Sequence, residues 1–263
     1  MGLSKKRVTD FELGPLWFPA KDSVMSDAIG FHGEWEPSLG SWLKKEILPS
    51  ITCVNIGANV GYFTCLMSRL VGPAGLIIAI EPRKDLVKLL KLNIKSAALP
   101  NVEVHNVAAT SSRQTIELWI NYRNAGDNRV FDPRRTAGGG SYQDHGFTRI
   151  PKKTKVKGRP VDEILNGRTI DFCLIDAQGW EHEIVRGMSN TLSCNLPTMV
   201  VEFVPDWIAD LGQNPHDVLR AYEDLGYCLS ILDSKEGVRA PAEIIRLIED
   251  SEGYFCDLVL RPI

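Results

Sequence analysis

A glycine turn and an acidic residue stand at the ends of two successive apolar runs of this sequence. The first run ends in residues 55–61, whose glycines Gly57 and Gly61 are four residues apart. Glycine lets the backbone approach a ligand closely, because no Cβ intervenes and positive φ is permitted. The second run ends at Glu81, about 20 residues farther on, where an acidic side chain accepts hydrogen bonds from ribose hydroxyls in nucleotide-binding α/β folds. The two motifs predict a site for a nucleoside-type cofactor, with a structural turn at Gly57 and a helix N-cap at Glu81 as the alternatives.

Three polar side chains near later apolar runs are candidates for proton transfer. Asp176 ends the run 170–176, Glu202 ends the run 199–203, and His182 opens a helical stretch between them. A carboxylate or imidazole held near a hydroxyl can act as its general base. Asp176 is the first choice, because the carboxyl end of a strand is where α/β sheets bind ligands. His182 and Glu202 are alternative bases, each with an ordinary interpretation as a helix-start or strand-end residue. No ligand cluster predicts a metal site, although Asp176 and Glu202 could converge.

The elements that must position these residues follow an alternating pattern from residue 51 onward. The expected strands are 51–56, 76–80, 102–106, 170–176, 199–203, 227–232 and 254–260, and the expected helices are 62–70, 86–97, 181–188, 216–225 and 242–250. Short apolar runs that alternate with helical stretches are typical of βαβ units and a parallel sheet. The sequence therefore predicts an α/β fold.

Two regions depart from this alternation. Residues 1–50 are expected to form an N-terminal cap with one amphipathic helix at 38–47, ahead of a core at 51–263. The region of about 115–159 has a strand pattern at 115–120 and another at 148–156 around a glycine-rich loop, which indicates an inserted β-hairpin or lid.

The ordered set of motifs resembles the core of FkbM-type methyltransferases. The resemblance is carried by residues 55–61, Ala79-Ile80-Glu81-Pro82, Asn93-Ile94, Asn101-Val102, Ala108-Ala109, residues 174–181 with Gly187, and Val200-Val201-Glu202-Phe203. It spans about residues 30–232. The resemblance implies a class I, Rossmann-like methyltransferase fold, with a mostly parallel seven-stranded sheet and helices on both faces. It also implies S-adenosylmethionine as the donor and O-methylation of a carbohydrate, macrolide or related small molecule.

The resemblance further implies which residues bind the donor. They are Glu34, Asn55, Gly57, Ala58, Asn59, Gly61, Glu81, Pro82, Asn106, Ala108 and Asp176. Glu34 resembles the glutamate that the family carries before its first strand, where it could face the donor's amino group. Asn106 and Ala108 follow the third strand and are expected to line the adenine pocket. The Gly-Asp-Asn-Arg stretch at 126–129 resembles that of some relatives and could shape the acceptor pocket, or simply form a turn.

Three residues depart from the family pattern. Asn55, Leu174 and Gln178 stand where the family usually has Asp, Lys and Glu. Asn55 can still form hydrogen bonds but cannot pair electrostatically with the donor's ammonium. The loss of Lys and Glu together looks like removal of a charge pair, which a structure tolerates better than the loss of one partner. These departures leave the catalytic role of the segment open, and they motivate an alternative function as a catalytically degenerate binding protein.

A basic stretch covers residues 129–159. It holds nine Lys or Arg residues against Asp132 and Asp144, a formal charge of +7 in a chain whose net charge is −3. This charge could attract an acidic or phosphorylated acceptor, or the phosphate backbone of a nucleic acid. The alternative interpretation is a solvated surface hairpin, and few rings, such as Tyr142 and Phe147, are present for stacking on bases. A nucleic-acid methyltransferase that uses the basic insertion is therefore kept as an alternative.

The composition is ordinary for a globular protein, with 44% hydrophobic and 24% charged residues. No apolar run reaches the roughly 18–20 residues of a membrane helix, and no apolar segment follows the basic N-terminus, so neither a membrane partner nor a secretory signal is expected. Six scattered cysteines without a C-x-x-C pair are expected to be reduced, which favours a cytoplasmic location. The missing G-x-G-x-x-G disfavours a nicotinamide-dependent oxidoreductase. The acceptor and the oligomeric state stay open, a homo-oligomer included.

Overall fold

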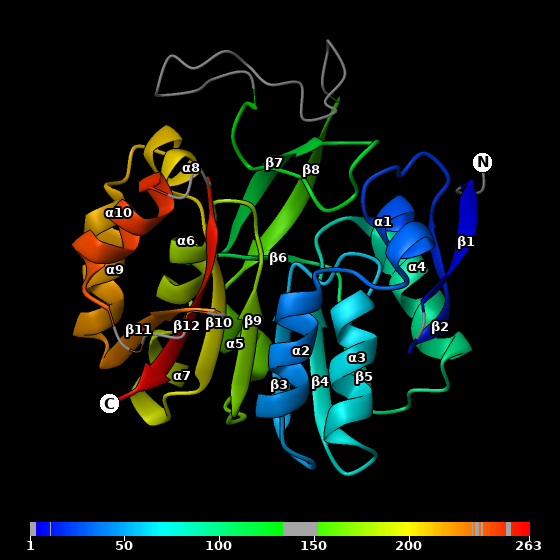
Figure 1. The fold of residues 1–263 in the computed structure, drawn as a ribbon, viewed down its shortest axis with the longest axis horizontal. Helices are drawn as coiled ribbons and strands as arrows, with labels where there is room; N and C mark the ends of the chain where they lie inside the picture. The colour runs from blue at the N-terminus through cyan, green and yellow to red at the C-terminus, as the bar shows by residue number, and fades with distance from the viewer. Residues whose placement is uncertain are drawn as a thin grey trace.

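The computed structural model describes residues 4–10, 12–133, 152–232, 234, 237, 239–250 and 254–263. A seven-stranded sheet in the order β11-β12-β10-β9-β3-β4-β5 runs through the molecule (Figure 1). Its strands are β3 (Thr52–Ile56), β4 (Leu76–Ile80), β5 (Val102–His105), β9 (Phe172–Ile175), β10 (Thr198–Phe203), β11 (Tyr227–Ile231) and β12 (Cys256–Pro262). The pairs β10-β9, β9-β3, β3-β4 and β4-β5 are parallel, and β12 is antiparallel to both β10 and β11. The predicted mostly parallel α/β sheet is confirmed.

The order of the strands places a switch point between β3 and β9. β3, β4 and β5 follow one another toward one edge, and the chain then returns to lay β9 on the other side of β3. Ligands of open α/β sheets bind at such a point, outside the carboxyl ends of the strands. Gly57 follows β3 and Asp176 follows β9, so the fold brings these two predicted site residues to the same edge.

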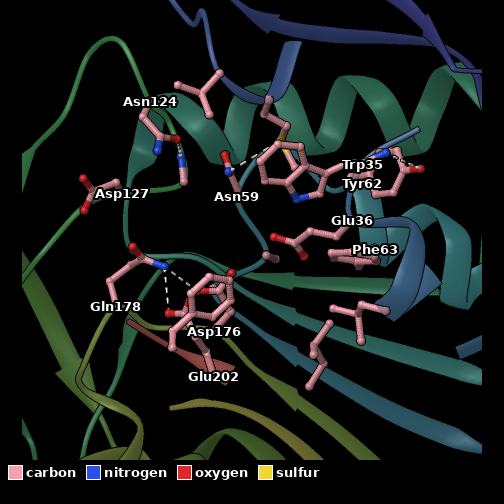
Figure 2. Close-up of a pocket in the computed structure, with 18 of the residues that line it drawn as sticks. Trp35, Glu36, Asn59, Tyr62, Phe63, Asn124, Asp127, Asp176, Gln178 and Glu202 are labelled. Atoms are coloured by element: carbon pink, nitrogen blue, oxygen red, sulfur yellow. Dashed lines mark hydrogen bonds between the residues drawn. The ribbon is translucent and has the colours of Figure 1, made fainter. Parts of the chain in front are cut away.

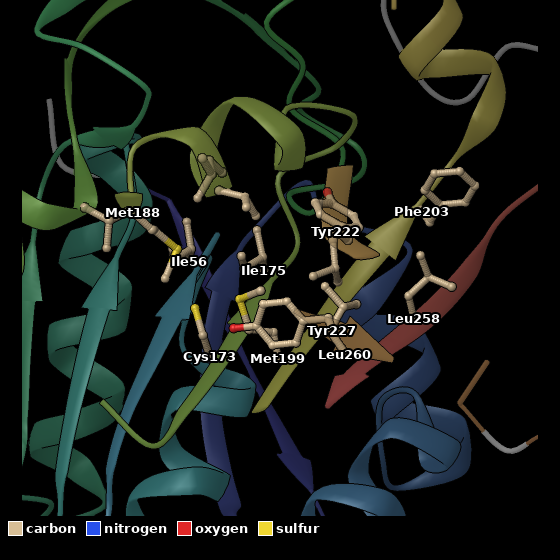
Figure 3. Close-up of a cluster of buried hydrophobic side chains, with 14 of the residues drawn as sticks. Ile56, Cys173, Ile175, Met188, Met199, Phe203, Tyr222, Tyr227, Leu258 and Leu260 are labelled. Atoms are coloured by element: carbon tan, nitrogen blue, oxygen red, sulfur yellow. The ribbon is translucent and has the colours of Figure 1, made fainter. Parts of the chain in front are cut away.

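Helices cover both faces of the sheet. They are α1 (Met25–His32), α2 (Pro37–Glu46), α3 (Tyr62–Val71), α4 (Lys84–Ser96), α5 (Val161–Leu165), α6 (Glu181–Arg186), α7 (Ser189–Cys194), α8 (Pro205–Asp210), α9 (Pro215–Asp224) and α10 (Pro241–Asp250). Cys53 faces the core that includes residues of α2, α3 and α4, whereas its neighbour Val54 faces the opposite core. Figure 3 shows this second core, in which Ile175 and Met199 from the sheet meet Tyr222 from α9. Strands that are buried on both faces read as continuous apolar runs, which explains why the sequence reveals them.

Among the described residues, five strands lie outside the large sheet: β1 (Lys5–Asp10), β2 (Gly14–Pro19), β6 (Ala108–Ala109), β7 (Gln114–Ile120) and β8 (Lys152–Arg159). Those before β3 add structure that the sequence did not predict. β1 and β2 form an antiparallel hairpin, and α1 follows it, whereas only a helix matching α2 was expected. The buried Asn93 of α4 fastens this hairpin. Its Oδ1 accepts a hydrogen bond from the Trp17 N–H at 2.8 Å, and its Nδ2 donates to the Val60 carbonyl at 2.8 Å.

The strands β7 and β8 of the inserted region join β6, which precedes that region, in a separate three-stranded sheet in the order β6-β8-β7. β7 and β8 pair antiparallel and lie near the upper end of the central sheet in Figure 1. The strand expected at 148–156 falls partly outside the described residues and continues to Arg159, because β8 also pairs with β6 through Ala109. The residues between Pro133 and Lys152, which carry part of the basic stretch, lie outside the described residues.

All six cysteines are free, and three of them, Cys53, Cys65 and Cys173, are buried. Burial raises the pKa of the Cys53 and Cys65 thiols to about 12, so these side chains behave as small apolar groups. In the described part of the chain, no helix is both long enough and apolar enough to cross a membrane.

Candidate functional site

The turn after β3 brings Gly57 against the end of β9. Gly57 has a φ of +82°, and a Cβ placed on it would lie 1.8 Å from the carbonyl oxygen of Asp176. Its N–H donates to the Ile80 carbonyl at 3.0 Å, so the turn spans the ends of β4, β3 and β9. Gly61 serves packing instead, since a Cβ there would lie 2.4 Å from Cδ1 of Leu90 in α4. Neither glycine position has room for a side chain.

A cavity of about 670 Å³ opens beside this turn (Figure 2). This volume is within the range of small-molecule sites. Its carboxylates are Glu36, Asp127, Asp176, Glu202 and Asp257, and its aromatic side chains are Trp35, Tyr62, Phe63, Trp207, Tyr254 and Phe255. A smaller hollow of about 70 Å³ shares Gly57 and Asn59 with the cavity and is also lined by Glu81, Pro82 and Ala108. Gly57 and Glu81 therefore face a common space.

Glu81 is buried at the end of β4 and is held by the backbone around it. Its Oε2 accepts a hydrogen bond from the Asn59 N–H at 2.9 Å, and its Oε1 accepts one from the Arg83 N–H at 2.8 Å. Burial raises the pKa of Glu81 to about 7, and the two N–H groups oppose this rise. A carboxylate has about four lone-pair sites, so two remain for further donors such as hydroxyl groups.

Asp176 and Glu202 meet at the carboxyl ends of β9 and β10. The Nε2 of Gln178 donates to Oδ1 of Asp176 at 2.7 Å and to Oε2 of Glu202 at 3.0 Å (Figure 2). Burial raises the pKa of both carboxyl groups, and the charge of Asp176 raises that of Glu202 further. Two carboxyl groups this close titrate as a pair, which holds a proton at a higher pH than an isolated carboxylate.

Three residues with strained backbone lie in the wall of this cavity. Glu36, Asn59 and Gln178 have left-handed φ values of 45°, 50° and 56°, and all three line the cavity. Residues other than glycine adopt this conformation only where the surrounding structure holds them there, and such residues cluster at functional sites. In Glu36 the strained backbone lies directly before α2 and places the side chain among the other carboxylates.

Glu36 makes the stability of the ligand-free protein depend on pH. Burial, with the charges of Asp176 and Asp257, raises its pKa from 4.5 to about 9. A carboxyl group with a raised folded-state pKa contributes most stability below its unfolded pKa and loses it as the pH rises through its folded pKa. We expect the melting temperature to fall between pH 4.5 and pH 9, and Glu36→Gln, which cannot ionise, to fall less. Thermal melts of both proteins test this, with the exposed Glu34→Gln as the control; parallel decline of parent and Glu36→Gln would contradict it.

S-Adenosylmethionine, the donor implied by the resemblance, fits the groups that line the cavity and the smaller hollow. Oδ1 of Asn59 and Nε1 of Trp180 are buried without a hydrogen-bond partner among the described residues, and both side chains line the smaller hollow. They offer an acceptor and a donor to the polar edges of a nucleoside, and Glu81 offers lone pairs to ribose hydroxyls. The carboxylates around Asp176 suit the positive charge of a sulfonium and an ammonium group.

Four of the predicted residues line neither the cavity nor the smaller hollow: Gly61, which packs against α4, and Glu34, Asn106 and His182. Glu34 is exposed, and Glu36, two residues later, lines the cavity instead. Asn106 donates from Nδ2 to the carbonyl of Glu81 at 3.0 Å, so it holds the end of β4 and does not line either hollow. His182 lines a separate hollow beside Tyr222 of α9, where burial lowers its pKa.

The position of His182 follows from the start of α6. The preceding residue, Glu181, turns its carboxylate back to accept hydrogen bonds from the Ala177 and Gly179 N–H groups at 2.8 and 3.1 Å. His182 then follows on the face of α6 that packs toward α9. The structure therefore does not bring His182 together with Asp176 and Glu202, as its predicted role as a base at this cavity would require.

The remaining predicted residues lie at or beside the site. Asn55 lines the cavity with Ala58, and its Nδ2 donates to Oγ1 of Thr64 at 2.8 Å. In the stretch 126–129, Gly126, Asp127 and Arg129 line the cavity, and Asn128 lines the smaller hollow. Leu174, one of the departures from the family pattern, is also in the cavity wall.

Sequence reasoning missed several residues of the cavity wall. Glu36, Trp207 and Tyr254 lie far apart in the chain, and Asp257 lies opposite Glu202 in the antiparallel pair of β10 and β12. For Glu36 the sequence held a signal. Proline is common at the first position of a helix, so Pro37 marks Glu36 as the residue at the start of a helix. The other three carry no local motif.

The described part of the basic stretch does not form one continuous set of unpaired cations. Arg129 is buried and pairs with Asp127 at 2.6 Å, with its guanidinium 4.1 Å from the ring centre of Trp207. Lys153 pairs with Glu117 at 3.0 Å on the neighbouring strand. Arg134, Arg135, Arg149, Tyr142 and Phe147 lie outside the described residues.

Comparison with known proteins adds the family. The sequence profile of the methyltransferase FkbM domain matches residues 55–229. None of the curated protein sequences matches the chain. Among solved structures, a candidate rRNA methylase from Clostridium thermocellum has a TM-score of 0.51 at 8% identity, over 86% of this chain and 96% of that one. This likeness concerns the fold alone.

Two further structures are similar at lower scores. The FkbM methyltransferase from Methylobacillus flagellatus has a TM-score of 0.47 at 13% identity over 80% of this chain, which spans only 43% of that protein. Fibrillarin from Aeropyrum pernix, solved with natively bound S-adenosylmethionine, has a TM-score of 0.46 at 11% identity, over 85% of this chain and 73% of that one.

The profile match covers the glycine turn, Glu81, Asp176 and Glu202, which lie at the carboxyl ends of β3, β4, β9 and β10. The chain therefore belongs to the FkbM family of methyltransferases, with the class I α/β fold and S-adenosylmethionine as its methyl donor.

Proposed function

We propose that the protein transfers a methyl group to a hydroxyl of a small molecule or carbohydrate, with Asp176 as the general base. The observation that carries this proposal is the position of Asp176, which follows β9, contacts the glycine turn through its backbone and lines the cavity. The donor supplies a methyl group already activated on a sulfonium, so the protein needs mainly to align the acceptor and exclude water.

A base with a raised pKa is suited to a hydroxyl acceptor. Transfer forms an O–CH₃ bond and breaks the S–CH₃ bond, whose electron pair stays on sulfur, while the hydroxyl proton passes to the base. General-base catalysis is most efficient when the pKa of the base lies near the working pH. Burial raises the pKa of Asp176 in this direction, and Glu202 beside it can share the proton that is taken up.

The charge of the cavity supports a neutral hydroxyl group over a phosphorylated one as the reacting part of the acceptor. The basic stretch favoured an acidic acceptor, but the described cavity wall has five carboxylates against the guanidinium groups of Arg123 and Arg129, and Arg129 pairs with Asp127. Even with Glu36 protonated, an anionic group would lie among the other four carboxyl groups, and the charge of Arg129 is already paired. The nucleic-acid alternative is tested separately, by RNA and DNA binding at low and high salt, where strong salt dependence would favour it.

A methyl-transfer screen tests the proposed function. The protein is incubated with S-adenosylmethionine carrying a deuterated methyl group and a panel of hydroxylated acceptors, and products are analysed by mass spectrometry and NMR. Methylation on oxygen supports the proposal. Methylation confined to nitrogen or carbon, or donor binding without any transfer across the panel, would count against it.

Replacing Asp176 with asparagine is expected to slow transfer about 100-fold or more while donor affinity changes little. Asparagine keeps the size of the side chain and a hydrogen-bond acceptor, but it cannot take up a proton at neutral pH. Single-turnover rates and calorimetric titration with S-adenosylmethionine separate the two effects. Asp171→Asn is the matched control, because Asp171 lies just before the same strand at its other end and accepts a hydrogen bond from the Thr52 N–H. Full activity of Asp176→Asn would remove Asp176 as the base.

A further inference from the structure

Gln178 occupies a constrained position between two carboxyl groups. It lies in the turn after β9 with a left-handed φ of 56°, and its side chain is largely buried, at 9% exposure. Gly179 follows with a φ of +94°, and a Cβ there would lie 2.9 Å from Cβ of Trp207. The turn therefore packs closely against α8, which holds the glutamine in its strained conformation.

The side-chain amide of Gln178 joins two neighbouring strands. Its nitrogen carries two N–H groups, and the two hydrogen bonds run to Oδ1 of Asp176 at 2.7 Å and to Oε2 of Glu202 at 3.0 Å. Figure 2 shows the amide directed at both carboxyl groups in the cavity. Hydrogen bonds to a charged acceptor are directional and stronger than neutral ones, so these two bonds fix the orientation of both carboxyl groups. We call the two hydrogen bonds of Gln178 the amide fork.

Further carboxyl groups surround this pair. Glu202 lies directly opposite Asp257 in the antiparallel ladder of β10 and β12, and like charges at such positions repel. The carboxyl groups whose charges act on this pair are Asp127, Glu181, Asp257 and Glu36. Among these acids, the amide of Gln178 supplies N–H donors without adding a negative charge.

We infer that Gln178 is a positioning residue, whose amide holds Asp176 and Glu202 together as one carboxyl pair that takes up the acceptor's proton. This inference rests on the proposed function for the role of the pair, but the geometry of the amide fork does not depend on the acceptor. The amide orients the Asp176 carboxylate and stabilises the ionised form of the pair, so that the pair is ready to accept a proton at a lower pH than burial alone would permit.

Gln178→Met tests this role, because methionine keeps the length and bulk of glutamine but has no N–H donor. The probe is the intact protein labelled with carbon-13 at the carboxyl groups of Asp and Glu and titrated by NMR, with and without S-adenosylhomocysteine. The signals of the pair are assigned by their loss in Asp176→Asn and Glu202→Gln. We expect the apparent pKa of the pair to rise by about one pH unit in Gln178→Met, since donors that favoured the charged form are lost.

Two more variants complete the design. Gln178→Glu replaces the donors with another carboxylate and is expected to raise the apparent pKa of the pair at least as far, which keeps the test available if the methionine variant does not fold. Gln213→Met is the matched control, because Gln213 lines the separate hollow of His182 and should leave the titration of the pair unchanged. Thermal melts establish that each variant is folded.

An unchanged titration of Asp176 and Glu202 in folded Gln178→Met or Gln178→Glu would overturn the inference. The outcome is separate from that of the proposed function, because the titration needs no acceptor. If methylation is found only on nitrogen, the proposed function fails while the titration can still show the amide fork. If O-methylation is found but the titration does not move, only the role of Gln178 fails.

Discussion

Replacing Glu81 with alanine is expected to lower the affinity for S-adenosylmethionine at least about 100-fold. Hydrogen bonds to a charged group contribute about 1.5–3 kcal/mol each, and a loss of about 2.7 kcal/mol corresponds to a factor of 100. Alanine would remove the carboxylate that faces the smaller hollow, and it would also leave the N–H groups of Asn59 and Arg83 without their acceptor. Isothermal titration calorimetry measures the effect.

Two variants separate binding from folding in this experiment. Glu81→Gln keeps an acceptor for one of the two backbone N–H groups, so we expect a folded protein with a smaller loss, of about tenfold. Glu117→Ala removes a carboxylate from the exposed surface of β7, where it pairs with Lys153, and should bind the donor like the parent. Unchanged affinity of Glu81→Ala would refute the assignment of Glu81 to the donor site.

Gly57→Ala is expected to destabilise the protein by about 3 kcal/mol or more and to abolish donor binding. The left-handed backbone costs a residue with a Cβ about 1–2 kcal/mol, and overpacking typically adds about 1–3 kcal/mol. The atom that the new Cβ would meet, the carbonyl oxygen of Asp176, belongs to a backbone whose N–H is bonded to the Ile56 carbonyl at 3.1 Å. It cannot move away without loosening the pairing of β3 and β9. Urea denaturation measures the loss of stability.

Gly212→Ala is the matched control for this prediction. Gly212 has a similar φ of +79°, but a Cβ there would meet nothing within 4 Å. We therefore expect only the cost of the left-handed backbone, about 1–2 kcal/mol, with donor binding retained. If Gly57→Ala were no less stable than Gly212→Ala, the turn would have room for a side chain, and the close approach to β9 would not be a requirement of the site.

Local sequence pattern was sufficient for the central strands and for the donor motifs. β4 coincides with the predicted run 76–80, because a strand that is buried on both faces is apolar along its whole length. The glycine turn and Glu81 were also found from the sequence, since a positive φ without space for a Cβ requires glycine, whatever packs around it. Such requirements act within a few residues, and they leave a readable signal.

Element ends and the N-terminal region were less readable. β12 runs over Cys256–Pro262, two residues later than the predicted strand, because its position is set by pairing with β10 and β11 on either side. The hairpin of β1 and β2 has half-exposed strands whose packing against α4 depends on Asn93, about 76 residues away in the chain. No local periodicity reports such a contact.

The sequence by itself determined the family, the order of the central elements and the chemistry of the glycine turn and its acidic partner. Only the tertiary structure decided that Glu36 and not Glu34 reaches the cavity, that His182 faces a different hollow, and that Gln178 joins Asp176 to Glu202. The physical reason is that these contacts depend on strand register, on the rotation of a helix about its axis and on the docking of the cap. Each is set by packing between segments distant in the chain, while sequence pattern reports the conformation of the segment itself.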